Sequence, residues 1–156
     1  MTKAYLIKSS EFYSQSRKAR IRKQDKIYVL DAGIRNAVVD YLDDNLSKDF
    51  TELGIVVESI IFDHLIRLKF NIEPGPEPEI FYWKNSKEID FVLPIKRKLI
   101  PIESKYRGKI PKESIEAIKV FIKEKDSPFG IIITKDEFDL EDNILKIPLW
   151  VFLLVV

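Results

Sequence analysis

The sequence predicts an α/β fold in which a mixed central sheet is flanked by helices. Three observations predict it: a long apolar helical pattern over residues 51–69, three consecutive strand patterns within residues 80–106, and a helix–strand pair over residues 111–134. Elements in this order pack as layers around one sheet. With 156 residues, 46% of them hydrophobic, the chain is long enough for one domain with a substantial core.

The first 50 residues form an N-terminal extension of strands plus a helix. Loose alternation over residues 4–13 predicts a strand, and a second short apolar strand runs over residues 27–30. Between them lies a basic run, residues 17–26. A helix is predicted over residues 34–42. Residues 51–156 form the second unit, which carries the chemistry discussed below.

The helix predicted over residues 51–69 carries a carboxylate close to its apolar stripe. Ile55, Phe62 and Leu65 lie three, four and seven residues from Glu58, which places Glu58 on or at the edge of the core-facing side. Asp63 and Arg67 are four residues apart and are predicted to pair. A proline-rich loop over residues 73–78 follows the helix.

Three strands are predicted next, over residues 80–83, 88–95 and 98–106. Alternate residues of a strand share a face, so Glu103 and Lys105 point the same way, and Asp90 shares a face with Val92. If the second and third strands pair as a hairpin, Asp90 approaches Glu103. The chain therefore predicts a convergence of charged groups inside apolar segments.

The C-terminal third completes the sheet. Pro111 opens a helix to about residue 125, whose predicted apolar stripe includes Ile118 and Phe121, and residues 129–134 are predicted to form a strand buried on both faces. Residues 147–156 are strongly apolar but too few to span a bilayer. We expect them to form a buried final element or a homodimer contact.

Composition narrows the classes of function. The net charge of +1 gives no global attraction to nucleic acid, so a local basic patch has to supply it. The absence of cysteine excludes disulfides, zinc–thiolate sites and cysteine nucleophiles. These features, with no secretory signal and no membrane-spanning segment, lead us to expect a cytoplasmic protein without a membrane partner.

The converging carboxylates indicate a metal site. Asp90 and Glu103 in a partly apolar setting repel each other unless a cation lies between them. Hard oxygen ligands select Mg²⁺ or Mn²⁺, which activate water and polarise a phosphodiester. Lys105 is placed to orient that water or stabilise developing charge, and Glu58 to position a metal-bound water. The four predicted catalytic residues are Glu58, Asp90, Glu103 and Lys105.

These residues resemble the pattern of the PD-(D/E)XK nuclease superfamily, whose fold is restriction-endonuclease-like. A closer resemblance, over nearly the whole chain, is to the C-terminal nuclease-like domain of archaeal and bacterial AAA-type ATPases. It is carried by residues 26–35, 53–58, 82–84, 88–92, 100–106 and 147–150. The resemblance implies that the backbone carbonyl of Ser104 is a further metal ligand, beside Asp90 and Glu103. It also implies an ATPase domain upstream in the parent protein.

Two departures from that family are visible. The chain has no phosphate-binding loop of the Gly-x-x-x-x-Gly-Lys-Ser/Thr kind, so the ATPase half is absent from it. Ser104 stands where the family has an apolar residue, and strand alternation points its side chain away from the site. This leads us to expect little catalytic consequence from Ser104.

Contact with DNA is assigned to the basic run and to two lysines beyond the third strand. Such runs also occur as solvated faces, so both interpretations stay open. The predicted nucleic-acid-binding residues are Arg17, Lys18, Arg20, Arg22, Lys23, Lys109 and Lys112.

The leading prediction is a metal-dependent endonuclease-like domain that hydrolyses DNA phosphodiester bonds, as a fragment or relative of an AAA-type ATPase. The alternative is a nuclease-fold module of an ATPase that binds DNA or regulates without cutting, or that serves dimerisation.

Overall fold

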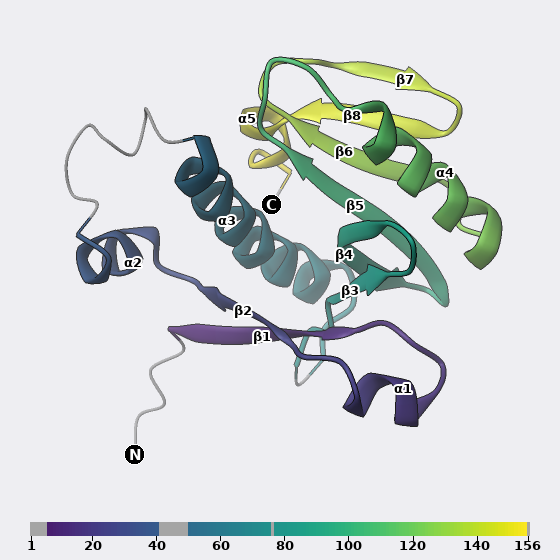
Figure 1. Cartoon of the computed structure of the whole chain (residues 1–156), viewed down its shortest axis with the longest axis horizontal. Coiled ribbons are helices and arrows are strands. Elements are labelled where there is room, and N and C mark those ends of the chain that lie inside the picture. The colour runs from purple at the N-terminus through teal and green to yellow at the C-terminus, as the bar shows by residue number, and fades with distance from the viewer. Residues whose placement is uncertain (1–5, 41–49, 76, 156) are drawn as a thin grey trace.

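The computed structural model describes residues 6–40, 50–75 and 77–155, and in this part of the chain eight strands form one mixed sheet (Figure 1). The strands are β1 (Ile7–Phe12), β2 (Lys26–Val29), β3 (Phe81–Lys84), β4 (Glu88–Ile95), β5 (Lys98–Lys105), β6 (Gly130–Thr134), β7 (Asp139–Glu141) and β8 (Ile144–Pro148). The helices are α1 (Arg17–Ile21), α2 (Ala32–Val38), α3 (Phe50–Ile72), α4 (Lys112–Lys125) and α5 (Leu149–Phe152). The predicted α/β class is confirmed.

The strand order across the sheet is β2-β1-β3-β4-β5-β6-β8-β7. The pairs β1–β2, β3–β4, β4–β5 and β7–β8 are antiparallel, and the pairs β1–β3, β5–β6 and β6–β8 are parallel. The N-terminal strands therefore extend the same sheet, because β1 pairs directly with β3. The hydroxyl of Ser10 donates to the carbonyl of Ile80 at 3.0 Å and fixes this junction.

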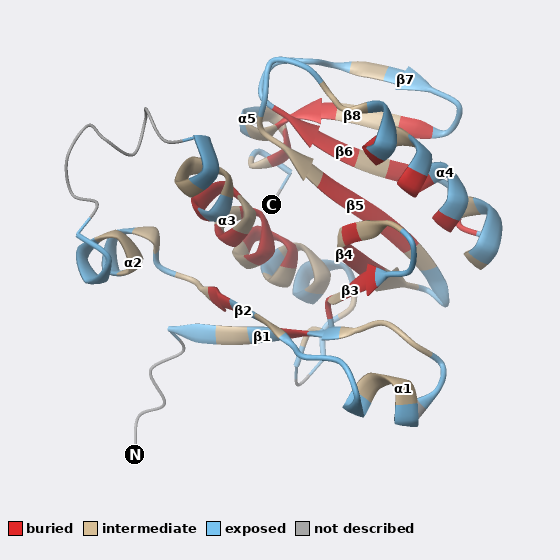
Figure 2. Ribbon diagram, in the orientation of Figure 1, coloured by how far each residue is buried: buried red, intermediate tan, exposed pale blue. Residues whose placement is uncertain are grey.

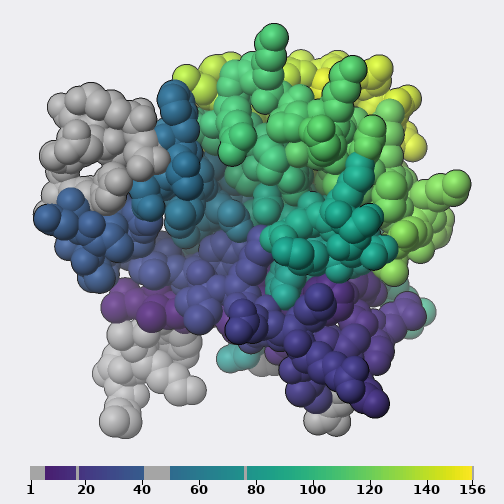
Figure 3. All heavy atoms as spheres, viewed as in Figure 1, coloured from purple at the N-terminus to yellow at the C-terminus, as the bar shows by residue number. Residues whose placement is uncertain are grey.

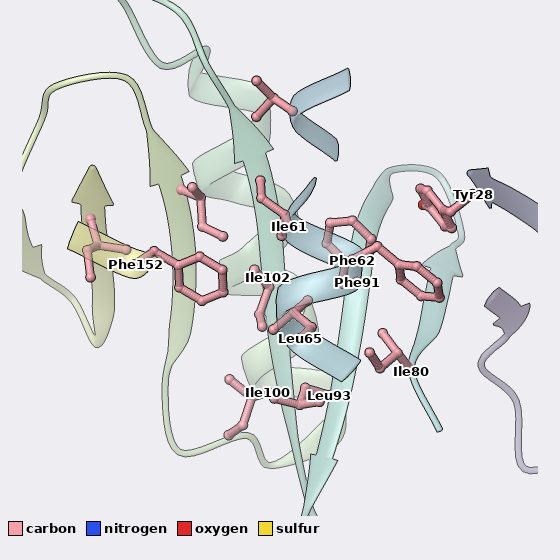
Figure 4. Packing of buried hydrophobic residues seen from close by; sticks show 13 residues of the cluster. Tyr28, Ile61, Phe62, Leu65, Ile80, Phe91, Leu93, Ile100, Ile102 and Phe152 are labelled. Atoms are coloured by element: carbon pink, nitrogen blue, oxygen red, sulfur yellow. The ribbon is translucent and has the colours of Figure 1, made fainter. Parts of the chain in front are cut away.

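The helices α3 and α4 cover opposite faces of the sheet, and each buries an apolar cluster (Figures 1 and 2). On the α3 face, the ring of Phe62 stacks on Tyr28 from β2 at 4.2 Å and lies 6.0 Å from Phe91 of β4 (Figure 4). On the α4 face, Trp83 meets Phe121 edge-on at 5.3 Å. Burial of these aromatic rings stabilises both layers.

The strand β6 lies in the middle of the parallel region, between β5 and β8. Ile132 and Ile133 are fully buried on opposite faces, which confirms the predicted doubly buried strand. The helix α4 makes the crossover from β5 to β6. Its residues Ile118 and Phe121 are fully buried, as the periodicity predicted, and Lys119 is exposed.

Several element boundaries differ from the predictions. The helix expected over residues 34–42 is α2, which already ends at Val38, because Asp40 adopts a left-handed conformation with φ of 60°. Residues 41–42, like residues 4–5 of the first predicted strand, lie outside the described residues. The short helix α1 within the basic run was not predicted, nor were β7 and β8.

The helix α3 extends three residues beyond its predicted end. Arg67 pairs with Asp63 at 2.7 Å, as predicted. The prediction that Ile55 faces the core is wrong, because 45% of its surface is exposed. No helix in the described ranges 6–40, 50–75 and 77–155 is both long and apolar enough to cross a membrane.

The C-terminal element α5 is anchored by buried Phe152, with partly buried Leu149 and Val151 packed against the same core. Phe152 is 4% exposed and packs 4.8 Å from the ring of His64 on α3, so the expected buried final element is present. Trp150, Leu154 and Val155 remain exposed on the same short segment. The alternative, a homodimer through this segment, stays a prediction.

Candidate functional site

The site lies where β4 and β5 part. Their backbone ladder pairs Phe91 with Ile102, and the strands then diverge. Beyond that point the carboxylates of Asp90 and Glu103 accept hydrogen bonds from backbone amides of the opposite strand. Ser104 N–H donates to Asp90 Oδ2 at 2.9 Å, and Asp90 N–H donates to Glu103 Oε2 at 3.2 Å. Each acid therefore satisfies an amide that would otherwise lack a ladder partner. The predicted hairpin, with Asp90 beside Glu103, is confirmed.

Asp90 reaches this position through a β-bulge. The register between β3 and β4 shifts, with Phe81 opposite Val92 but Trp83 opposite Ile89. Ile89 and Val92 consequently pack in the same cluster under α4, whereas Asp90 turns toward α3. The prediction that Asp90 and Val92 share a face is wrong, because a bulge breaks strict alternation at this residue.

Lys105 closes the site from the end of β5. Its Nζ lies 2.7 Å from Glu103 Oε1 and 3.9 Å from Asp90 Oδ2, and it also donates to the Ser104 carbonyl at 3.0 Å. Glu103 is 5% exposed, so this ion pair lies in a setting with little water. The structure thus brings three of the predicted catalytic residues together.

Glu58 approaches from α3, held by two residues of β2. The hydroxyl of Tyr28 donates to Glu58 Oε1 at 2.7 Å, and Lys26 Nζ lies 3.5 Å from the same oxygen. Lys26 is also 3.4 Å from Asp90 Oδ1. Lys26 therefore connects Glu58 to Asp90.

The outer rim of the site is Glu88, at the start of β4. It lies 2.8 Å from Lys26 Nζ and 2.7 Å from Lys84 Nζ. Lys26, Tyr82, Lys84 and Glu88 line an open hollow of about 450 Å³ together with residues 22–25. On the face shown in Figure 3, the purple N-terminal segment lies against the teal β3–β4 turn.

The electrostatics follow from burial and from crowding of negative charge. Burial, and then the neighbouring Asp90, raises the pKa of Glu103 to about 7, although Lys105 opposes the shift. The pKa of Glu58 is raised by the same two causes, burial first. Burial lowers the pKa of Lys26, but Asp90, Glu58 and Glu88 outweigh it and the net shift is upward. Crowding of carboxylates at the centre of the site therefore favours the protonated forms of Glu103 and Glu58.

The donor chemistry fits Mg²⁺ or Mn²⁺. Two carboxylates, from Asp90 and Glu103, stand beside the Ser104 carbonyl, and Mg²⁺ is commonly held by one or two carboxylates with water completing its shell. Within residues 6–40, 50–75 and 77–155 no group of three or more acidic, histidine or cysteine side chains is arranged to hold a metal ion. In this structure the ammonium groups of Lys26 and Lys105 lie among the carboxylates instead.

The predicted DNA-contacting residues do not all line the same surface hollow. Arg22 and Lys23 line the hollow beside Lys26, while Arg20 lines a separate hollow with Lys23 and Glu11. Lys18 is exposed on α1, and Lys109 and Lys112 are exposed just beyond β5. The side chain of Arg17 lies outside the described part of the structure.

Sequence reasoning missed three residues of this site: Lys26, Tyr28 and Glu88. Lys26 was treated as the last cation of the basic run. Strand alternation at Lys26-Ile27-Tyr28 was the available signal, since it places Lys26 and Tyr28 on one face and leaves Ile27 71% exposed on the other.

Comparison with known proteins gives one match. No curated protein and no solved structure gave a match to the chain. A family profile described as "Domain of unknown function (DUF4143)" matches residues 53–152, a range that includes Glu58, Asp90, Glu103 and Lys105. The chain belongs to this DUF4143 family.

Proposed function

We propose that the chain is a Mg²⁺- or Mn²⁺-dependent endonuclease-like domain of the PD-(D/E)XK type that hydrolyses DNA phosphodiester bonds. The observation that supports this best is the fork between β4 and β5. There Asp90 and Glu103 face each other across diverging strands, with Lys105 2.7 Å from Glu103. Ladder pairing alone does not require two acids and a lysine at one buried point, and burying them is costly.

Each residue has a role that its contacts support. Asp90, Glu103 and the Ser104 carbonyl would hold the metal, which supplies Lewis-acid polarisation of the phosphodiester and a water of lowered pKa. The Ser104 amide orients Asp90, and Tyr28 orients Glu58. Lys105 would donate a hydrogen bond to the phosphate oxygens as negative charge develops on them. Burial of the site strengthens this interaction.

The approach of DNA is supported by the basic lining of the neighbouring hollow. Arg22, Lys23 and Lys84 border it, and it leads to Lys26 and Glu88 at the rim of the acids. Cations placed in this way neutralise backbone phosphates without reading sequence. We place the protein in the cytoplasm, with an ATPase domain as its partner in the parent protein.

A second candidate is a nuclease-fold module that binds DNA or regulates an ATPase without cutting. The observation in its favour is that Lys26 and Lys105 already neutralise much of the acid cluster. Such a cluster can be a purely structural ion-pair network.

A cleavage assay separates the two candidates. Wild-type protein is incubated with plasmid, linear and branched DNA and Mn²⁺, beside Glu103→Gln, Lys105→Met and the control Lys119→Met, which removes an exposed lysine of α4 that pairs with Asp142. We expect nicking by the wild type and by the control, and a loss of about 100-fold or more in both site variants, since each removes a charged group from the reacting centre. No cleavage by wild type on any substrate, or equal cleavage by all four proteins, would overturn the nuclease proposal.

A further inference from the structure

Lys26 stands among the acids as an internal cation. It comes from β2, 32 residues before Glu58 and 64 before Asp90, so only the tertiary fold brings it here. Its Nζ lies 3.5 Å from Glu58 Oε1, 3.4 Å from Asp90 Oδ1 and 2.8 Å from Glu88 Oε1. One ammonium group thus connects the α3 acid to the β4 acids.

The contacts of Lys26 with the two inner acids are loose. Charge-assisted N–H···O bonds are usually about 2.7–2.9 Å long. Only the contact with Glu88 falls in that range, whereas those with Asp90 and Glu58 are longer by more than half an ångström. The ammonium therefore lies between Asp90 and Glu58 without a short hydrogen bond to either, and its closest partner is Glu88 at the outer edge of the site.

The charges at the centre are unequal. Three carboxylates, from Glu58, Asp90 and Glu103, share the two ammonium groups of Lys26 and Lys105. With all three acids ionised, one negative charge remains in excess while Lys26 is in place. A divalent cation that takes the position of Lys26 removes this excess, because its two charges and that of Lys105 match the three acids.

Lys26 has a path out of the centre. It lines the hollow of about 450 Å³ shared with Lys84 and also a smaller one of about 200 Å³ shared with Glu58, and its side chain is 24% exposed. The lysine stem is long and flexible. A change of rotamer in this stem moves the ammonium away from Asp90 and Glu58 without a change in the backbone of β2.

From these contacts we propose that Lys26 is an exchangeable resident cation: a divalent metal ion enters the cluster by displacing its ammonium from Asp90 and Glu58. This inference rests on the proposed metal site. Glu88 is the residue that retains the displaced ammonium. Metal affinity in the wild type is then reduced by competition, and Lys26 is a positioning residue that sets the metal concentration at which the site fills.

Calorimetric titration of the full chain with Mn²⁺ tests the exchange. The wild type is compared with Lys26→Met, with Lys26→Gln in case the methionine variant folds poorly, and with Lys26→Arg. The matched control is Lys84→Met, which removes an ammonium from the same Glu88 but not from Asp90 or Glu58. Loss of the competing charge should tighten Mn²⁺ binding at least tenfold in the Met and Gln variants. Lys26→Arg and Lys84→Met should stay within about threefold of the wild type.

The outcomes separate this inference from the proposed function. Equal or weaker Mn²⁺ binding by the Lys26→Met and Lys26→Gln variants, beside measurable binding by wild type, would overturn the exchange and leave the metal site standing. Absence of Mn²⁺ binding in every protein would overturn the metal site, and the exchange with it. Binding by the two neutral variants but not by wild type would support the exchange strongly.

A second measurement needs no neutral variant. Lysine side chains of the wild type are labelled by ¹³C-methylation, and the Lys26 resonance is assigned from its absence in Lys26→Arg. We expect this resonance to shift as Mg²⁺ saturates the site, while that of the exposed Lys119 stays fixed. A Lys26 resonance that does not move while Mg²⁺ binds would overturn the proposal.

Discussion

Burial of the ionised Glu103 carboxylate should lower the free energy of unfolding, and the substitution Glu103→Gln should reveal this. Glu103→Gln keeps the size of the side chain and an oxygen that accepts from Asp90 N–H, but it removes the negative charge. In metal-free solution the charge is poorly compensated, since burial and Asp90 raise the pKa of Glu103 to about 7 from an ordinary value of 4.5. The variant should therefore gain stability wherever the wild-type carboxyl is ionised.

The sign and size of the effect follow from linkage. An acid whose pKa is higher in the folded state favours folding when protonated, so its contribution is retained below about pH 4.5 and is lost as pH rises through 7. One pKa unit corresponds to about 1.36 kcal/mol. Between pH 5 and pH 8, we expect the free energy of unfolding of wild type to fall by about 2 kcal/mol relative to Glu103→Gln.

Urea unfolding in the presence of a chelator measures this difference at both pH values. Comparison of the two proteins cancels the titrating groups that do not interact with residue 103, while Asp90 and Lys105, which do, are part of the measured difference. Glu116→Gln is the control: Glu116 is an exposed acid paired with Lys87, and its difference from wild type should be nearly independent of pH. An equal difference in stability between Glu103→Gln and wild type at pH 5 and pH 8 would show that the pKa of Glu103 is not raised in the folded protein.

Three further outcomes are expected. The pKa of His64 is lowered by burial and then by Arg67, so wild-type stability should fall as pH drops below about 6.5, and the slope near pH 6 of an unfolding series should be smaller in His64→Phe. Tyr28→Phe removes the 2.7 Å bond to Glu58 and should lower the free energy of unfolding by about 1–2 kcal/mol in urea titration; no loss would show that the bond is not formed in solution. Gly130→Ala would place a Cβ 2.3 Å from the Ile118 side chain, and a thermal melt should register a loss of about 1–3 kcal/mol, whereas an unchanged melting temperature would contradict this packing.

The fork between β4 and β5 was predictable because it depends on local patterns. Two strands separated by the short Lys96-Arg97 connection must pair as a hairpin, and their lengths then bring Asp90 toward Glu103. The direction of Asp90 was not predictable from alternation. The bulge that turns it toward α3 arises from pairing with β3, a relationship absent from the pattern of β4 alone.

Lys26 and Tyr28 escaped prediction for a different reason. Their partners are 32 and 30 residues away on α3, and the parallel pairing of β1 with β3 is what brings β2 toward that helix. No sequence spacing encodes such a contact. In the basic run, Lys26 looks like any other solvated cation.

The hairpin of β7 and β8 did carry a usable signal. Asp142 and Asn143, both with positive φ, connect the two strands, and such residues are favoured in two-residue hairpin turns. Ile144 and Ile147 then supply the buried positions of β8. The turn residues, together with those isoleucines, would have completed the predicted sheet.

Diffraction from a crystal soaked in Mn²⁺ tests whether the acids between β4 and β5 hold a metal ion. Anomalous scattering locates manganese independently of any activity. We expect a peak between Asp90 and Glu103, with the Lys26 ammonium moved away from Asp90 toward Glu88. A fully soaked crystal with no peak there, and with Lys26 still between Asp90 and Glu58, would contradict it.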